Sequence, residues 1–151
     1  MGELRPSNLI AAAESSREAL QRHAGSDWDA LAGDLDWTCR RTLDHIVDVL
    51  AFYGAHLATR SSARLPFTRD GAPSASIDEL ITCVGSQAAV LVRVCEASGG
   101  VRAFHSAGMA DSTGFVAMGC DEILVLNGDS PLLTGDVLSA LTQGRGDAPL
   151  A

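Results

Sequence analysis

The residues of this sequence best suited to chemistry are His45 and Glu122. His45 belongs to an apolar stretch with helical spacing, which predicts that its imidazole points into the interior of a helical bundle. Glu122 shares a predicted helix face with Phe115 and Met118. A carboxylate on such a face needs a cation or a hydrogen-bond donor as partner, because burying it alone is costly. Facing helices of a bundle supply His and carboxylate ligands to a metal, so the pair is a candidate metal site.

A catalytic metal site of this kind has at least three protein ligands and one open position. His56 cannot join His45, because eleven residues of helix separate their positions by about 16 Å. Three residues could complete the site, depending on how the helices pack: Asp48, His105 and Asp129. The alternative is that His45 and Glu122 form a buried hydrogen-bonded pair without a metal.

Four stretches have the apolar periodicity of helices, and they would position these residues. They cover residues 6–23, 37–60, 76–98 and 112–126. Pro6 suits a first helical turn, the run from Ser76 to Glu79 is a capping box, and Asp111 or Ser112 can cap the fourth helix. Residues 130–141 allow a short extra C-terminal helix, and residues 142–151 read as a loose tail.

The connections between these helices differ in length and character. Residues 26–36 form an acidic connector. Its apolar residues Trp28, Leu31 and Leu35 are expected to fold over the bundle end together with the following Trp37. Residues 61–74 are long enough to cross from one end of a bundle to the other. Residues 101–111 read as an ordered loop or a short extended piece. The sequence therefore predicts an all-α protein, a single domain of 151 residues with a four-helix core over about 6–129.

The composition excludes some classes of function. The chain has 46% hydrophobic and 20% charged residues, which is ordinary for a globular protein. Its net charge is −8 and it lacks a basic cluster, which argues against binding nucleic acid. It has neither an apolar run of ~18 residues nor a recognisable export signal, so we expect no membrane span and a cytoplasmic location.

The four cysteines are Cys39, Cys83, Cys95 and Cys120, and none is part of a C-x-x-C pair. This spacing argues against a zinc knuckle or a thioredoxin-type motif and favours free thiols. Cys39 lies at the start of the second predicted helix, where the helix dipole can lower a thiol pKa. A redox-active Cys39 is therefore one alternative, and a small buried residue is the other.

Two runs of this sequence resemble the DinB-like proteins, and most closely the maleylpyruvate isomerase N-terminal domain of mycothiol-dependent actinobacterial enzymes. The first run extends from Trp37 to Ile46, and the second covers residues 104–125. The resemblance extends over about residues 9–129. It implies a four-helix bundle with a long connection between the second and third helices. It also implies a divalent metal such as zinc or nickel, held by one His on the second helix and by Glu-x-x-x-His on the fourth.

His45 and Glu122 match the first two ligands of that family, but Leu126 stands where the family has the third. Leucine cannot bind a metal, so three outcomes remain open. Asp129 or His105 substitutes for the missing ligand, the bundle is a metal-free descendant, or the metal binds weakly with extra water ligands. The family's catalytic members also carry a C-terminal extension that this sequence lacks beyond about Leu141.

Two hypotheses of function follow, and they leave open whether the protein is an enzyme. In the first, the protein is a diverged member of the family that uses mycothiol as cosubstrate. A metal-bound thiolate would then add to a small electrophilic molecule in thiol transfer or isomerisation. In the second, it is a metal-free, non-catalytic bundle that binds a small ligand or forms a homodimer.

Overall fold

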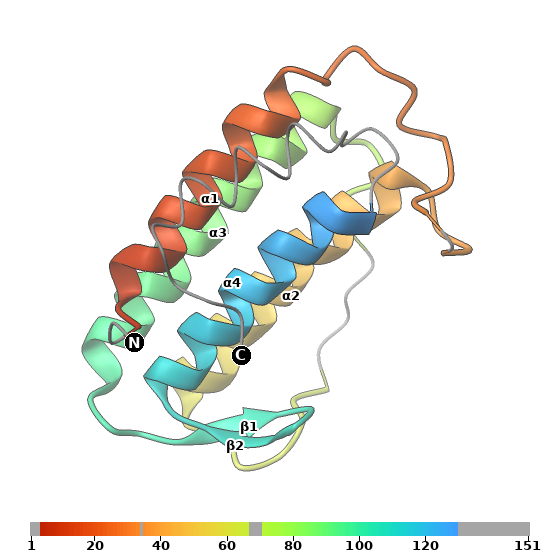
Figure 1. Cartoon of the computed structure of the whole chain (residues 1–151). Coiled ribbons are helices and arrows are strands. Elements are labelled where there is room, and N and C mark those ends of the chain that lie inside the picture. The colour runs from red at the N-terminus through yellow and green to blue at the C-terminus, as the bar shows by residue number, and fades with distance from the viewer. Residues whose placement is uncertain (1–3, 34, 67–70, 130–151) are drawn as a thin grey trace.

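The computed structural model describes residues 4–33, 35–66 and 71–129 and contains four helices and one hairpin (Figure 1). The helices are α1 (Pro6–Gln21), α2 (Cys39–Thr59), α3 (Ile77–Ser98) and α4 (Ser112–Asp129). The hairpin consists of β1 (Ala103–His105) and β2 (Gly108–Ala110). The prediction of a mostly helical protein is confirmed. The predicted helix over residues 130–141 and the tail over 142–151 lie outside the described residues.

The helix boundaries follow local capping interactions. Thr38 caps α2 through its side chain, which accepts a hydrogen bond from the backbone of Arg41. The predicted capping box starts α3: Ser76 Oγ accepts from Glu79 N, and Glu79 Oε2 accepts from Ser76 N. Asp111 Oδ1 accepts from the backbone N–H of Gly114 and so satisfies one free donor of the first turn of α4.

The hairpin is the one regular element that the sequence did not predict as such. β1 and β2 pair antiparallel, with Ala103 opposite Ala110 and His105 opposite Gly108. Each strand has three residues, which is too short for alternation of polar and apolar residues to be recognised. The hairpin closes the end of the bundle where α2 and α3 finish and α4 begins (Figure 1).

The helix directions are fixed by contacts near the helix ends. The last residue of α1, Gln21, donates from Nε2 to Asp78 Oδ1 at the start of α3, 2.7 Å away. Ala72, shortly before α3, donates its backbone N–H to Asp44 in the second turn of α2. α2 and α3 therefore start at the same end of the bundle and run parallel, while α1 and α4 run the opposite way (Figure 1).

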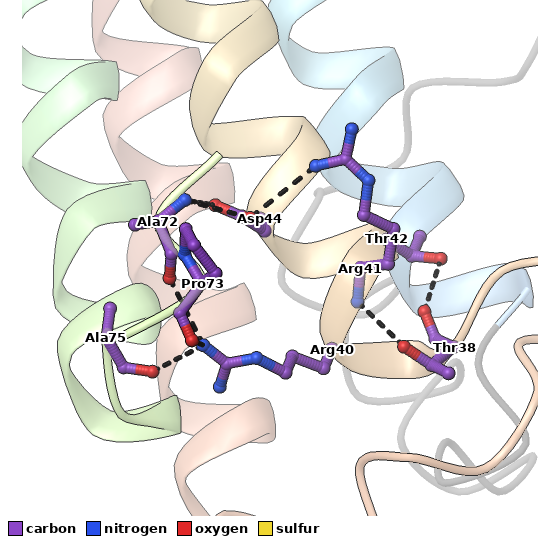
Figure 2. A network of polar contacts seen from close by, with 8 residues as sticks. All are labelled: Thr38, Arg40, Arg41, Thr42, Asp44, Ala72, Pro73 and Ala75. Atoms are coloured by element: carbon purple, nitrogen blue, oxygen red, sulfur yellow. Dashed lines mark hydrogen bonds and ion pairs between the residues drawn. The ribbon is translucent and has the colours of Figure 1, made fainter. Parts of the chain in front are cut away.

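Polar side chains of α2 hold both ends of the long connection between α2 and α3. At one end, His56 Nε2 accepts from Leu65 N at 3.1 Å. At the other end, both carboxylate oxygens of Asp44 accept from Ala72 N at 3.0 Å (Figure 2). Arg40 donates to the carbonyls of Ala72, Pro73 and Ala75. The two described ends of the connection thus lie against the last turn and the first turns of α2.

The core lies between the four helices. The apolar residues of α2 with helical spacing are mostly buried. α3 buries Leu80, Ile81, Val84, Ala88, Leu91 and Cys95, while Ile77 is half-buried. The largest fully buried apolar side chains are Phe115, Leu9, Leu20, Leu43, Leu50, Leu57, Leu80, Ile81, Leu91 and Ile123. Among the described helices, α3 has the length and mean hydropathy of a membrane span, a test that core helices also pass.

Candidate functional site

A chain of three hydrogen-bonded side chains connects the hairpin, α2 and α4. His105 Nε2 lies 3.1 Å from Tyr53 Oη, and Tyr53 Oη donates to Glu122 Oε1 at 3.0 Å. His105 Nδ1 accepts from the backbone N–H of Ala107 at 3.1 Å, so Nε2 carries the proton and donates to Tyr53. The order of donation is therefore His105 to Tyr53 to Glu122. We call these three residues the interior polar chain.

The surroundings of the interior polar chain are apolar. Tyr53 and His105 are 6% and 9% exposed, and Glu122 is half-buried. The fully buried Phe115 ring meets both rings edge-on, with centroids 5.6 Å from Tyr53 and 6.1 Å from His105. In such surroundings each polar group needs a partner, and the order of donation supplies one to every member.

Burial is the main reason that the pKa of His105 lies below its ordinary value. The charge of Glu122 opposes this lowering of the pKa, and the neighbouring His56 adds to it. The imidazole is therefore neutral at pH 7, which agrees with its accepting a hydrogen bond at Nδ1. A neutral imidazole joined through a tyrosine to a carboxylate can orient neighbouring groups or relay a proton. In this arrangement Glu122 Oε1 already accepts the hydrogen bond from Tyr53.

The predicted metal ligand His45 lies against Trp37 near the start of α2. Its ring is half-buried and meets Trp37 edge-on, with centroids 4.9 Å apart. Arg41, one turn earlier on α2, places its guanidinium carbon 5.5 Å from the centroid of the same indole ring. Trp37 is 41% exposed, so these side chains form a surface cluster of an aromatic ring with two basic groups. We call Trp37, Arg41 and His45 the tryptophan cluster.

Only part of the apolar cap expected over the bundle end is buried. Trp28 is 6% exposed and donates from Nε1 to the carbonyl of His23. Leu31, Leu35 and Trp37 are 59%, 40% and 41% exposed. Burial of this cap is thus confirmed for Trp28, while Leu31, Leu35 and Trp37 stay partly at the surface.

The metal ligands expected from the sequence do not assemble among the described residues. Within 4–33, 35–66 and 71–129, no group of three or more His, Cys, Asp and Glu side chains has a geometry that could hold a metal. Glu122 and His105 come together through Tyr53, whose hydroxyl hydrogen-bonds to both. The side chains of Leu126 and Asp129 lie outside the described part, so Asp129 as a substitute ligand stays a prediction. On the described residues, the donor set does not fit a metal at Glu122.

His56 and two of the cysteines, Cys39 and Cys95, have structural settings. His56 is fully buried, and its Nδ1 donates to the carbonyl of Phe52 at 2.9 Å while Nε2 accepts from Leu65. Cys39 is buried, with its thiol 3.8 Å from the carbonyl of Leu31. Burial raises the pKa of Cys95 to about 11, which makes this thiol a weak nucleophile at pH 7.

Sequence reasoning missed Tyr53, although one signal was available. Tyr53 is the only tyrosine of the chain and lies in the most apolar part of the central helix. A buried phenol usually finds a hydrogen-bond partner, so a lone tyrosine there indicates a polar neighbour. Its partners are 52 and 69 residues away in sequence, so helical spacing could not identify them.

Comparison with known proteins identified no relative of this chain. No family model matches the chain, and neither a curated protein nor a solved structure was found to be similar.

Proposed function

We propose that the chain is a diverged bundle of the DinB-like type. Two features support this proposal: the resemblance of the Trp37–Ile46 run, and a long connection between α2 and α3 whose described ends lie against opposite ends of α2. That connection lets α2 and α3 run parallel, which a short loop would not permit.

Within that proposal, the bundle works without a metal centre at Glu122. Its support is the hydrogen bond from Tyr53 Oη to Glu122 Oε1, which gives this carboxylate a partner within the bundle. A metal at Glu122 would need further protein ligands, and the described residues offer no group of three. Metal-dependent thiol transfer or isomerisation with mycothiol stays a prediction that depends on Asp129.

The function proposed is the non-catalytic binding of a small planar anion, such as an aromatic carboxylate, at the tryptophan cluster. One observation carries it: an indole that is 41% exposed lies beside the guanidinium of Arg41 and the imidazole of His45. The exposed part of the indole offers a surface for stacking an aromatic ring. The Arg41 side chain, 39% exposed, offers a bidentate partner for a carboxylate, although it shares its charge with Asp44 at 3.5 Å.

Titration with benzoate, monitored by tryptophan fluorescence, tests this function. Benzoate should quench the fluorescence saturably, because it stacks on the exposed Trp37 and not on the buried Trp28. The Trp37→Phe variant should lose the quenching, and Arg41→Gln should weaken binding by up to about fivefold, as expected for an exposed ion pair.

Benzyl alcohol is the control ligand, because it has the same ring without the charge. Equal quenching by benzyl alcohol would exclude the proposed role of Arg41. Quenching that persists in Trp37→Phe would place any binding away from the tryptophan cluster and contradict the proposed site.

A further inference from the structure

Positive charge gathers at the end of the bundle that the hairpin closes. α2 and α3 finish at this end, and α1 and α4 begin there (Figure 1). Its described parts are residues 4–12, 53–66 and 92–118, and their charged side chains are those of Arg5, Arg60, Arg64, Arg93, Arg102, Glu96 and Asp111. Arginines thus outnumber carboxylates here, although the whole chain has a net charge of −8. Such a local excess of positive charge attracts anions.

Two of these arginines border a shallow hollow between the last turns of α2 and α3. The hollow has a volume of about 270 Å³ and is lined by Leu57, Ala58, Arg60, Arg93, Val94, Ala97 and Ser98. We call it the arginine hollow. Its apolar lining is aliphatic and contains no aromatic ring. An aliphatic wall with a few polar groups at its edge suits an aliphatic ligand that carries a charged head.

Arg60 has a backbone conformation that favours glycine. It caps α2 with φ +55°, and it is the one non-glycine residue with positive φ in the part of the chain that the structure describes. Glycine is the usual residue at such a position, because any other side chain costs backbone strain. Balancing the helix dipole does not require this strain, since a cation elsewhere in the last turn serves equally well. Strain that persists at one residue points to a use for its side chain.

Both guanidinium groups of the arginine hollow are available to a ligand. Within residues 4–33, 35–66 and 71–129, the Arg60 side chain makes no hydrogen bond and no ion pair. Arg93 Nη1 lies 3.2 Å from Glu96 Oε2, but the Arg93 side chain is 84% exposed, so water weakens this pair. A ligand carboxylate can therefore accept charge-assisted hydrogen bonds from either arginine.

We propose that the arginine hollow binds a short aliphatic carboxylate. Its chain lies against Val94 and Ala97, and its carboxylate lies between Arg60 and Arg93. A water molecule takes up about 30 Å³, so the hollow holds about nine waters, which is room for a chain of about six carbons with its carboxylate. This inference is independent of planar-anion binding at the tryptophan cluster, which lies near the start of α2, whereas the hollow lies near its end.

Titration with hexanoate, monitored by two-dimensional amide NMR spectra, tests this site. The backbone amides of Ala58, Val94 and Ala97 should shift saturably. The dissociation constant should be on the order of 1 mM, because the hollow is open and its ion pairs are exposed. Hexanol has the same chain without the charge and should bind more weakly than hexanoate.

Substitutions of the two arginines separate binding from stability. Arg60→Gly and Arg93→Gln should each weaken hexanoate binding about two- to fivefold, because each removes one exposed ion pair. Arg60→Gly should keep or raise the melting temperature, since it relieves the left-handed strain. Arg22→Gly is the matched control: Arg22 caps α1 at the other end of the bundle with φ −64°, and its loss should leave hexanoate binding unchanged.

Three results would overturn the proposal. The first is the absence of a saturable shift at the three amides. The second is equal binding of hexanol and hexanoate, which would exclude a role for the arginines. The third is an unchanged hexanoate affinity in the double variant Arg60→Gly/Arg93→Gln, which would place binding elsewhere.

Discussion

Replacing Gly71 by alanine is expected to destabilise the protein by about 3 kcal/mol. Gly71 has φ +73°, and a Cβ atom there would collide with the Asp44 carboxylate. The strain of a left-handed alanine is about 1–2 kcal/mol. The displaced Asp44 would also lose its hydrogen bonds from Ala72, and a hydrogen bond to a charged group contributes about 1.5–3 kcal/mol. Urea unfolding, monitored by circular dichroism, measures the total loss of unfolding free energy.

Gly100→Ala is the matched control for this substitution. Gly100 has φ +69°, but a Cβ atom there would have no neighbour within 4 Å. Gly100→Ala should therefore lower the unfolding free energy only by the backbone strain of about 1–2 kcal/mol. Equal losses at the two positions would mean that Asp44 does not hold the connection before α3.

The second large effect is expected for Tyr53→Phe, which should lower the unfolding free energy by about 2–3 kcal/mol. The substitution keeps the ring but removes the hydroxyl between His105 and Glu122. His105 Nε2–H is then left without its acceptor, and Glu122 loses a donor, although its half-buried carboxylate can recruit water. Chemical denaturation at pH 7 gives the size of the loss.

A double-mutant cycle shows whether this loss comes from the interior polar chain. Glu122→Gln should weaken the same bond, so the two substitutions together should cost less than the sum of their separate effects. Strict additivity, or a loss below about 0.5 kcal/mol for Tyr53→Phe, would show that the hydroxyl is not held as described.

Local signals in the sequence predicted most of the helical fold. The capping box at Ser76 and Glu79 involves neighbours three residues apart, so its pattern is readable directly from the sequence. The apolar stripe of α2 repeats at helical spacing and identifies its buried face. Both kinds of signal depend on residues within one or two helical turns.

The arrangement of the candidate site could not be predicted in this way. Asp44 binds Ala72 across 28 residues, and Tyr53 binds Glu122 across 69. Such pairs depend on how helices pack, which spacing within one helix does not specify. His45 was therefore assigned to an interior pair with Glu122 because both have inward helical spacing. In the structure, Glu122 accepts a hydrogen bond from Tyr53, which lies two turns further along α2 than His45.

The central claim, that Glu122 is held by Tyr53 and not by a metal, is tested most directly by metal content. The protein would be purified without chelator, offered zinc and nickel, dialysed and analysed by mass spectrometry beside His45→Ala. The account predicts that the wild type retains no more metal than the variant. Near one metal per chain in the wild type, lost in His45→Ala, would contradict it and favour the metal-dependent thiol chemistry.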